Sequence, residues 1–418
     1  MIEIKGPKEN INVEILLAGS KSISNRVELL NFLFKSKRQI LNSSESEDTK
    51  LLKEAIHLIS NSNAATIDVK HAGTNMRFLT AILSATKGDW ILTGSERMKQ
   101  RPIAALVDAL REIGAQITYI EKDGFPPLKI KGDKLKGNKL KVKANISSQY
   151  VSALLIIAPF LENGLEIETI GTLVSKPYLK MSIELLKEFG IEVTQNLNFI
   201  FVAPKKHQQV QSTEQNFIIE SDWSSASYWY SICALSKNSQ IHLSSFEANS
   251  LQADSVVKNI FENLGVKTVM KGHQLVLENI GKAVDFLEYD CVDCPDIAQT
   301  IAVPCFALGI KTHLKGLQTL KIKETDRILA LKTELEKCGA TVIANDDSIQ
   351  IEPHLNNLNF NQTIHITTYH DHRMALSFAP LAFIFNSIIV DDELVIDKSY
   401  PTFWKDLENV GFNIKIKN

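Results

Sequence analysis

A stretch with a helical apolar pattern, ended by glycine and followed by a strand-like alternating run, occurs five times in this chain. Each glycine suits the left-handed residue that commonly ends a helix, and each following run alternates as a strand does. Repetition at a nearly constant interval is typical of folds built from copies of one small unit. The terminal glycines are Gly114, Gly190, Gly265, Gly339 and Gly411, with successive differences of 76, 75, 74 and 72 residues.

A sixth, weaker copy is expected near the N-terminus. There the helical run Asp48–Ile59 would end with Asn61 or Asn63 in the left-handed conformation, and Ile67–Lys70 would form the strand. Units of about 70 residues that mix helices and strands are too small to be stable alone but can pack in threes. The repeats therefore predict an α/β fold with two lobes of three units each.

Two segments rich in small hydroxyl residues, Leu17–Arg26 and Glu220–Ser227, do not fit the interior of the repeats. Such residues suit turns and the first turns of helices. We interpret both segments as crossings between the lobes. This predicts one lobe of residues 20–221 and a second lobe of residues 1–19 plus 222–418.

The composition is that of an ordinary soluble globular protein, with 418 residues, 44% hydrophobic residues and a formal net charge of −2. The longest apolar run, Val151–Leu161, is too short to span a membrane, which needs about 20 residues. The N-terminus carries no recognisable secretory signal, and five cysteines do not make a disulfide framework. Lysines alternate with apolar residues over Lys129–Lys143 without aromatic or arginine partners, which indicates a strand with one wet face. We therefore expect a cytoplasmic protein that binds neither nucleic acid nor membranes.

Arginine is scarce, since only 8 of the 46 lysine and arginine residues are arginine. In such a chain an arginine is a candidate for a place that needs a planar, forked cation, and its usual partners are carboxylates and phosphates. Five of the eight lie in motifs that precede or open a predicted helix, where the helix dipole favours anions. The alternative in each case is a capped helix with solvated surface charges. The motifs contain Lys21 and Arg26, Gly73 and Arg77, Arg101, Arg327, and Arg373.

The same motifs predict where their helices begin. Ser22 or Ser24 is expected to cap the helix after Gly19, Pro102 is expected at the first position of its helix, and Thr325 or Asp326 is expected to cap the helix that follows Lys323.

Other polar segments also open predicted helices. Ser147–Gln149 and Ser175–Tyr178 are either plain helix caps or binding groups for a phosphate or polyol. Asp296 follows a proline just before an apolar helix, which suits either an N-cap or a group for acid–base chemistry.

Two sequence patterns suggest metal or redox sites, and we interpret neither of them so. Cys291 and Cys294 form a single CxxC pair without a second pair, which indicates structural or incidental thiols. His370 and His372 flank Asp371 in a turn without a partner cluster, so we do not expect a metal site.

Taken in order along the chain, these segments resemble the 5-enolpyruvylshikimate-3-phosphate synthase family, the 3-phosphoshikimate 1-carboxyvinyltransferases. The resemblance runs from Gly19 to Pro401, nearly the whole chain. It implies two lobes, each with three similar βαβαββ-type units around a pseudo-threefold axis, and an active site in the cleft between the lobes. The segments that carry it are 19–26 (GSKSISNR), 97–102 (RMKQRP), 147–149 (SSQ), 174–178 (VSKPY), 323–327 (KETDR) and 371–375 (DHRMA).

The resemblance also implies the reaction, which is transfer of the enolpyruvyl group of phosphoenolpyruvate to the 5-hydroxyl of shikimate 3-phosphate with release of phosphate. It implies no metal or organic cofactor, and we expect a monomer. Residues implied for phosphoenolpyruvate are Lys21, Gly73, Arg101, Gln149, Arg327, Arg373 and Lys398. Residues implied for shikimate 3-phosphate are Lys21, Ser22, Arg26, Ser147, Ser148, Gln149, Ser175, Tyr178, Asp296 and Lys323.

Roles in the chemistry follow from the need to move protons at two centres during addition and elimination. Asp296 is assigned as the base at the hydroxyl, Glu324 as the proton donor to the methylene carbon, and Lys21 as the group that stabilises phosphate charge. Gly73, where alanine would narrow the pocket, predicts sensitivity to the inhibitor glyphosate.

Two alternatives remain at this point. One is the sister enolpyruvyl transferase that acts on UDP-N-acetylglucosamine, which is expected to have Lys-Asn rather than Lys-Ser at positions such as 21–22. The other is a non-catalytic anion-binding protein. Asp296 and Glu324 count against the second, because carboxylates among bound anions weaken binding unless they transfer protons.

Overall fold

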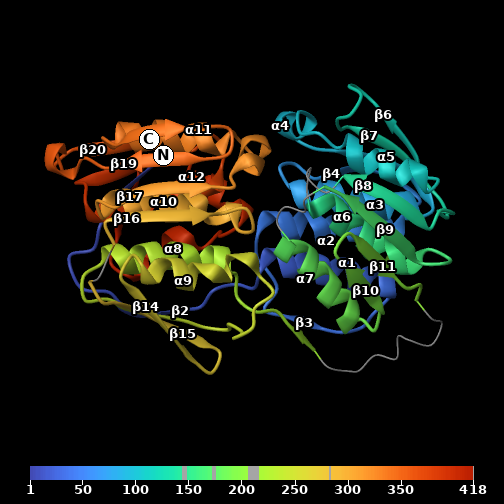
Figure 1. Cartoon of the computed structure of the whole chain (residues 1–418), viewed down its shortest axis with the longest axis horizontal. Coiled ribbons are helices and arrows are strands. Elements are labelled where there is room, and N and C mark those ends of the chain that lie inside the picture. Colours follow the sequence, from blue (N-terminus) through green and yellow to red (C-terminus); the bar gives the residue numbers. More distant parts are fainter. Residues whose placement is uncertain (144–147, 172–175, 206–215, 282–283, 418) are drawn as a thin grey trace. The chain divides into compact units, whose positions relative to one another are not determined.

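The computed structural model describes residues 1–143, 148–171, 176–205, 216–281 and 284–417. Its contacts divide the chain into two compact units (Figure 1). Unit 1 comprises Met1–Ser20 and Glu220–Asn418, and unit 2 comprises Lys21–Ile219. The predicted site residues Ser147 and Ser175 lie outside the described residues.

One pattern of strands and helices recurs in both units, and its chain order is strand, helix, strand, helix, strand, strand. The first two strands pair in parallel, the fourth lies antiparallel beside the second, and the third pairs antiparallel with the fourth at the edge of the sheet. We call the helix between the two parallel strands the inner helix, and the helix after the second strand the outer helix. This pattern confirms the predicted α/β fold of βαβαββ-type units.

Unit 1 contains three complete copies of this repeat among the described residues. The first copy is split, because all of unit 2 is inserted after its first strand, and the third is completed by the N-terminal strand. The first copy is β2 (Asn12–Ile15), α8 (Trp223–Leu235), β13 (Gln240–Leu243), α9 (Val257–Glu262), β14 (Val266–Lys271) and β15 (Gln274–Asn279). The second copy is β16 (Phe286–Asp290), α10 (Ala298–Ala307), β17 (Lys311–Lys315), α11 (Arg327–Lys337), β18 (Thr341–Ala344) and β19 (Ile349–Glu352). The third copy is β20 (Thr363–Ile366), α12 (His372–Phe378), β21 (Ser387–Val390), α13 (Phe403–Asn409), β22 (Asn413–Ile416) and β1 (Ile2–Lys5).

Unit 2 contains two complete repeats and one shortened repeat in its described part. The first is β4 (Ala64–Asp68), α3 (Gly73–Ala85), β5 (Gly88–Thr93), the short α4 (Glu96–Lys99), α5 (Ala104–Glu112), β6 (Gln116–Tyr119) and β7 (Leu128–Gly132). The second is β8 (Lys139–Lys143), α6 (Ser148–Ile157), β9 (Leu165–Ile170), α7 (Lys176–Glu188), β10 (Val193–Asn196) and β11 (Phe199–Val202). The shortened repeat is β12 (Phe217–Ile218), α1 (Lys21–Phe34), β3 (Ile40–Leu41) and α2 (Glu47–Asn61).

Short 3-10 helices adjoin several of these elements in both units. In unit 2 one such helix follows α6, at Ala158–Phe160. In unit 1 they are Ala253–Val256, Pro295–Ile297, Gln318–Ile322, Leu355–Asn357, Ala379–Phe383 and Leu394–Lys398.

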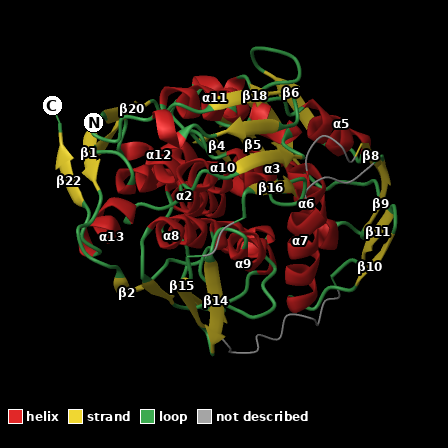
Figure 2. Cartoon of the chain, turned by 60° about the vertical axis from the view of Figure 1, so that its left-hand side comes forward, coloured by secondary structure: helices red, strands yellow, loops and turns green. Residues whose placement is uncertain are grey.

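The inner helices α8 and α10 are apolar or small on nearly every side, and a helix of that kind is stable only when buried, so both contribute to the core of unit 1. Every residue of α10 is buried, and α8, α10 and α12 contact one another in unit 1. In unit 2, α3 and α6 pack together and α1 also contacts α6. Outer helices bury one face only, as α9 does against β14 (Figures 1 and 2).

The five predicted glycines all adopt the left-handed conformation, with φ between 79° at Gly190 and 101° at Gly114. In each case the outer helix ends and an antiparallel edge strand begins, so this expectation is confirmed. The position needs glycine because a Cβ strains a backbone with positive φ.

The expected sixth copy is wrong in its details. Among the described residues, neither Asn61 nor Asn63 has a positive φ, and α2 is followed by Ser62 in an extended conformation. The next strand, β4, is not the edge strand of this repeat but the first parallel strand of the following one. The chain therefore runs from α2 directly into a new repeat, which leaves this sheet with two strands.

Some predicted helix starts are also wrong. Ser22 and Ser24, expected as caps, lie inside α1, because the helix already begins at Lys21. Pro102 lies two residues ahead of α5 rather than at its first position. Asp326 caps α11 as predicted, since its carboxylate accepts hydrogen bonds from the backbone N–H groups of Ile328 and Leu329. In the described part of the chain, no helix has both the length and the apolar character needed to cross a membrane.

Candidate functional site

Most of the predicted functional side chains lie where helices begin, whereas Lys398 ends a 3-10 helix, and each unit gathers its own set. In unit 1 they form one charged group, which we call the unit 1 cluster: Asp296, Lys323, Glu324, Arg327, Asp371, Arg373 and Lys398. In unit 2 they lie around the starts of α1, α2, α3 and α6 and the segment before α5, which we call the unit 2 cluster: Lys21, Asp48, Gly73, Thr74, Asn75, Arg101 and Gln149.

Arg327 is the centre of the unit 1 cluster. It is the first residue of α11 and is only 2% exposed. Its guanidinium donates to Asp371 Oδ2 at 2.6 Å from Nε, to Asp296 Oδ1 at 2.8 Å from Nη1, and to Glu324 Oε2 at 2.8 Å from Nη2. Burial alone would lower the pKa of Arg327, but these three carboxylates outweigh it and raise the pKa. One planar cation thus joins acids from three different segments.

Asp296 lies in the 3-10 turn before α10 and faces three cations. Lys323 Nζ lies 3.3 Å from its Oδ1, and Arg373 Nη2 lies 3.7 Å from its Oδ2, in addition to Arg327. Burial would raise the pKa of Asp296, but Lys323, Arg373 and Arg327 outweigh burial and hold that pKa well below its usual value. The carboxylate is therefore ionised at neutral pH, which is the form that a proton acceptor needs.

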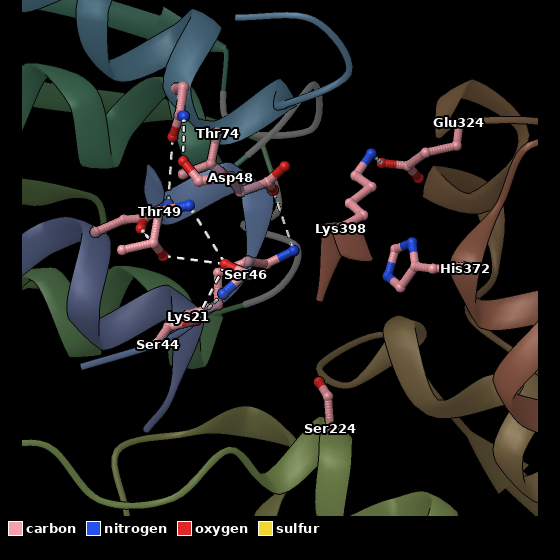
Figure 3. Close-up of polar contacts among 12 residues, drawn as sticks. Lys21, Ser44, Ser46, Asp48, Thr49, Thr74, Ser224, Glu324, His372 and Lys398 are labelled. Carbon is pink, nitrogen blue, oxygen red and sulfur yellow. Dashed lines mark hydrogen bonds and ion pairs between the residues drawn. The ribbon is translucent and has the colours of Figure 1, made fainter. Parts of the chain in front are cut away.

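Glu324 and Lys398 form a second pair in the same cluster. Lys398 donates from Nζ to Glu324 Oε1, and both side chains are about one-tenth exposed (Figure 3). Glu324 uses its other oxygen for Arg327. The Glu324 carboxylate consequently lies between two cations, the ammonium of Lys398 and the guanidinium of Arg327.

Asp371 has a part in the cluster that the sequence did not reveal. It is fully buried, caps α12 by accepting from the backbone N–H of Arg373, and binds Arg327 through both oxygens. The sequence analysis included Asp371 in the segment 371–375 and did not expect a metal site at His370, Asp371 and His372, but it assigned Asp371 no role. Within the described residues, no group of three His, Cys, Asp or Glu side chains is placed to hold a metal ion.

A second acid that the sequence missed, Asp254, adjoins the cluster through Ser224. Arg373 Nη2 donates to Ser224 Oγ at 3.3 Å, and the Ser224 hydroxyl donates to Asp254. Burial raises the pKa of Asp254 to about 7, although Arg373 lowers it in part. Asp254 lies in a 3-10 turn before α9, and no sequence motif surrounds it. Its position next to the unit 1 cluster could therefore be seen only in the folded structure.

The unit 2 cluster is built on polar side chains that tie three helix starts together. Lys21, the first residue of α1, pairs with Asp48 of α2 at 3.1 Å (Figure 3). Asn75 of α3 donates to the backbone carbonyl of Asp48 at 2.6 Å and accepts from Asn25 of α1 at 3.2 Å. Asp48 was not predicted, although its place in the first turn of a helix is one that acids favour.

Arg101 and Gly73, which come from separate motifs, lie against each other. A Cβ added to Gly73 would lie 2.7 Å from Arg101 Nη1 and 2.8 Å from Nη2, so the guanidinium rests against the glycine backbone. Arg101 is 7% exposed. Gln149, in the first turn of α6, donates to Thr74 next to Gly73 at 3.3 Å. This arrangement gives a cation and an amide side chain beside the start of α3.

Arg26 lies deeper than its motif suggested. It is 2% exposed, its Nε donates to Ser182 of α7 at 2.8 Å, and its guanidinium lies over the ring of Phe78 at 5.0 Å. Burial lowers the pKa of Arg26 to about 10. Ser182 in turn donates to the carbonyl of Tyr178, so Arg26 connects α1 with the predicted Tyr178 segment. Ser148 is buried at the start of α6.

The cysteines take no visible part in either cluster. All five are free and buried. A hydrogen bond with Cys291 and burial raise the pKa of Cys294 above its usual value, which disfavours a reactive thiolate. This supports the interpretation of the CxxC pair as structural thiols.

Three comparisons with known proteins agree with one another. The family model described as EPSP synthase (3-phosphoshikimate 1-carboxyvinyltransferase) matches residues 57–407. A 3-phosphoshikimate 1-carboxyvinyltransferase from Bacteroides fragilis (strain YCH46) is 44% identical over 407 residues, which cover 97% of both chains. Another relative with the same name, from Sulfurovum sp. (strain NBC37-1), is 36% identical and covers 97% of this chain and 98% of its own.

The fold comparison gives the same result for the architecture. A solved structure of EPSP synthase from Acinetobacter baumannii superposes with a TM-score of 0.76 and 20% sequence identity, over 99% of both chains. Identity at this level shows the fold alone, and that fold is the one described above.

Proposed function

Because the chain belongs to the EPSP synthase family, we propose that it transfers the enolpyruvyl group of phosphoenolpyruvate to the 5-hydroxyl of shikimate 3-phosphate and releases phosphate. The observation that carries this proposal is the unit 1 cluster, in which the carboxylates of Asp296 and Glu324 both bind Arg327. Each also has a lysine partner of its own, Lys323 for Asp296 and Lys398 for Glu324. A protein that only bound anions would be weakened by these acids, whereas a reaction with two proton transfers needs them. The names of the relatives do not favour the UDP-N-acetylglucosamine alternative.

Both substrates are anions, so the cations of both clusters are proposed to offset their mutual repulsion. Phosphoenolpyruvate would contact Gly73, Arg101, Gln149 and Lys21 of unit 2, and Arg327, Arg373 and Lys398 of unit 1. Shikimate 3-phosphate would contact Lys21, Ser22, Arg26, Ser147, Ser148, Gln149, Ser175 and Tyr178 of unit 2, and Asp296 and Lys323 of unit 1.

In the addition step, the 5-hydroxyl oxygen forms a bond to C2 of phosphoenolpyruvate while C3 gains a proton. We assign Asp296 to take the hydroxyl proton and Glu324 to protonate C3. Asp296 is a weak base while Lys323, Arg373 and Arg327 surround it. Bound phosphate and carboxylate groups would share those cations, which would raise the pKa of Asp296 and strengthen it as a base.

In the elimination step, the bond between C2 and the phosphate oxygen breaks and C3 loses a proton. Glu324 takes this proton and so regains the one that it gave to C3, while Lys21 stabilises the charge on the departing phosphate. The proton that Asp296 took from the hydroxyl leaves with the phosphate, which returns Asp296 to its carboxylate form. Lys398 donates a hydrogen bond to Glu324 and adds positive charge beside it. These steps involve no metal or organic cofactor. We also propose that the protein is a monomer and acts in the cytoplasm.

The experiment is a coupled assay of phosphate release from phosphoenolpyruvate with each acceptor in turn. We expect release that requires shikimate 3-phosphate, and its loss in Asp296→Ala. Asp346→Ala, which removes an exposed acid paired with Lys321 in the same unit, is the matched control and should keep full activity. Release that depends on UDP-N-acetylglucosamine would assign the protein to the sister reaction, and tight binding without release would make it an anion-binding protein.

A further inference from the structure

The turn that leads into α12 has an unusual backbone. Tyr369 and His370 both have positive φ, 53° and 55°, although neither is glycine. Two consecutive non-glycine residues in this conformation are strained and persist only where the surrounding structure holds them. The next residue is Asp371, which binds Arg327 in the unit 1 cluster. What holds this turn therefore matters for the cluster.

Glu334, on α11, holds the turn with both carboxylate oxygens. Oε1 accepts from the Tyr369 hydroxyl at 2.7 Å, and Oε2 accepts from the backbone N–H of Thr367 at 3.2 Å. The side chain of Glu334 is fully buried, and Lys337 balances its charge with contacts of 2.8 and 2.9 Å. A buried carboxylate that lacks hydrogen-bond partners destabilises the folded protein. Glu334 therefore favours the conformation in which the turn supplies these partners.

Glu334 and Arg327 lie seven residues apart on α11 and so project from the same face of the helix. Arg327 binds the end of the segment at Asp371, and Glu334 binds its beginning at Thr367 and its middle at Tyr369. Helix α11 thus binds the segment 367–371 on both sides of the strained turn. Arg373 follows two residues after Asp371, and its backbone N–H donates a hydrogen bond to Asp371 Oδ1.

We propose that Glu334 is a positioning residue, which through Tyr369 keeps the turn in its left-handed conformation and so sets Asp371 and Arg373 for the anionic substrate. This inference rests on the proposed function, in which Arg373 contacts phosphoenolpyruvate. Burial and the hydrogen bond to Glu334 raise the pKa of Tyr369 to about 12, so its hydroxyl remains a donor at every physiological pH. Glu334 itself would touch no substrate.

The test compares Tyr369→Phe and Glu334→Gln with a matched control, Glu336→Gln. Glu336 lies on the same helix and also pairs with a lysine, Lys332, but it is exposed. For the first two variants we expect the KM for phosphoenolpyruvate to rise about tenfold, while the KM for shikimate 3-phosphate changes less than about twofold. Tyr369→Phe loses only the hydroxyl that donates to Glu334. Its KM values therefore test the proposal even if Glu334→Gln folds poorly.

A rescue experiment separates positioning from general stability. His370→Gly allows positive φ without strain, so adding it to Tyr369→Phe should return the KM for phosphoenolpyruvate to within about twofold of that of His370→Gly alone. Equal changes in both KM values, or a defect that glycine does not rescue, would overturn the proposal. So would an unchanged KM for phosphoenolpyruvate in a folded Glu334→Gln protein.

Amide hydrogen exchange tests the inference independently of turnover. Peptides that cover residues 367–373 should exchange faster in Glu334→Gln than in the wild type, and Glu336→Gln should leave them unchanged. A wild-type protein without phosphate release would end the proposed function, yet the exchange result would still show whether Glu334 holds the turn. Unchanged exchange in Glu334→Gln would overturn the inference even if the enzyme is active.

Discussion

The two clusters both lie at helix starts, yet they balance charge in different ways. In the unit 1 cluster nearly every cation faces a carboxylate, and Arg327 alone binds three. In the unit 2 cluster the acid Asp48 pairs with Lys21, and amide side chains, a hydroxyl and a backbone carbonyl make the contacts among Asn25, Asn75, Asp48, Gln149 and Thr74. The guanidinium of Arg101 rests against the backbone of Gly73.

This difference indicates a division of work. Carboxylates held among cations can accept and donate protons, and their pKa values respond when bound anions share those cations. Amides, hydroxyls and helix starts hold anions without exchanging protons at neutral pH. We therefore expect substitutions in unit 1 to reduce turnover and stability, and substitutions in unit 2 to weaken substrate binding first.

The largest effect is expected for Arg327→Gln. It removes the common partner of three carboxylates, and Asp371 among them is fully buried. Loss of one partner from a buried ion pair costs about 3–5 kcal/mol of stability, and phosphate release should fall by about a thousandfold or more. Denaturant unfolding and the phosphate assay measure both. The control is Lys321→Gln, which removes a cation from an exposed pair in the same unit and should change neither stability nor phosphate release. An Arg327→Gln protein as stable as the wild type would contradict the proposed difference between the clusters.

A smaller effect is expected for Gly73→Ala in unit 2. Its Cβ would clash with the Arg101 guanidinium, which is the mobile end of a long side chain and can move aside. The KM for phosphoenolpyruvate should rise about tenfold, inhibition by glyphosate should weaken, and the melting temperature should barely change.

A double-mutant cycle checks that this effect acts through Arg101. The effect of Gly73→Ala on the KM should shrink in an Arg101→Lys background, because the displaced group is then absent. Additive effects, or a glyphosate inhibition curve that Gly73→Ala leaves unchanged, would show that Gly73 does not shape this pocket.

The smallest effect concerns pH and Asp254. Burial raises its pKa to about 7 in the folded protein, whereas an unfolded aspartate has a pKa near 3.9. The folded state therefore binds the proton more tightly, so this contribution is complete below pH 4 and is lost as the pH rises toward and past 7. Asp254→Asn should flatten this fall in melting temperature between pH 4 and pH 8. A pH profile identical to that of the wild type would contradict the buried, proton-binding state of Asp254.

The sequence predicted what local pattern determines. The glycine after each outer helix follows from a conformation that only glycine adopts easily, and the Asp326 cap follows from its place before a helical run. Anion-binding motifs could be recognised because they open helices. The shortened repeat in unit 2 could not, because the strand after α2 looks the same whether it ends one repeat or starts the next.

The missed residues share a different cause. Asp48, Asp254 and Glu334 carry no distinctive motif, and each acquires its partner from a segment distant in the chain. Asp371 was visible in the sequence, but its bidentate contact with Arg327, 44 residues away, exists only because the fold brings the starts of α11 and α12 together. Likewise the motif of Arg26 predicted an anion-binding cation, but it does not reveal that Ser182 and Phe78 enclose this side chain.

The most direct measurement is the separation of binding from turnover in Asp296→Asn. Calorimetric titration with shikimate 3-phosphate and the phosphate-release assay should be run on the same preparation. If unit 1 supplies the proton chemistry, affinity should stay within about fivefold of the wild type while release falls by about a thousandfold or more. An Asp296→Asn protein that releases phosphate at nearly the wild-type rate, or one that loses affinity and turnover equally, would contradict the account.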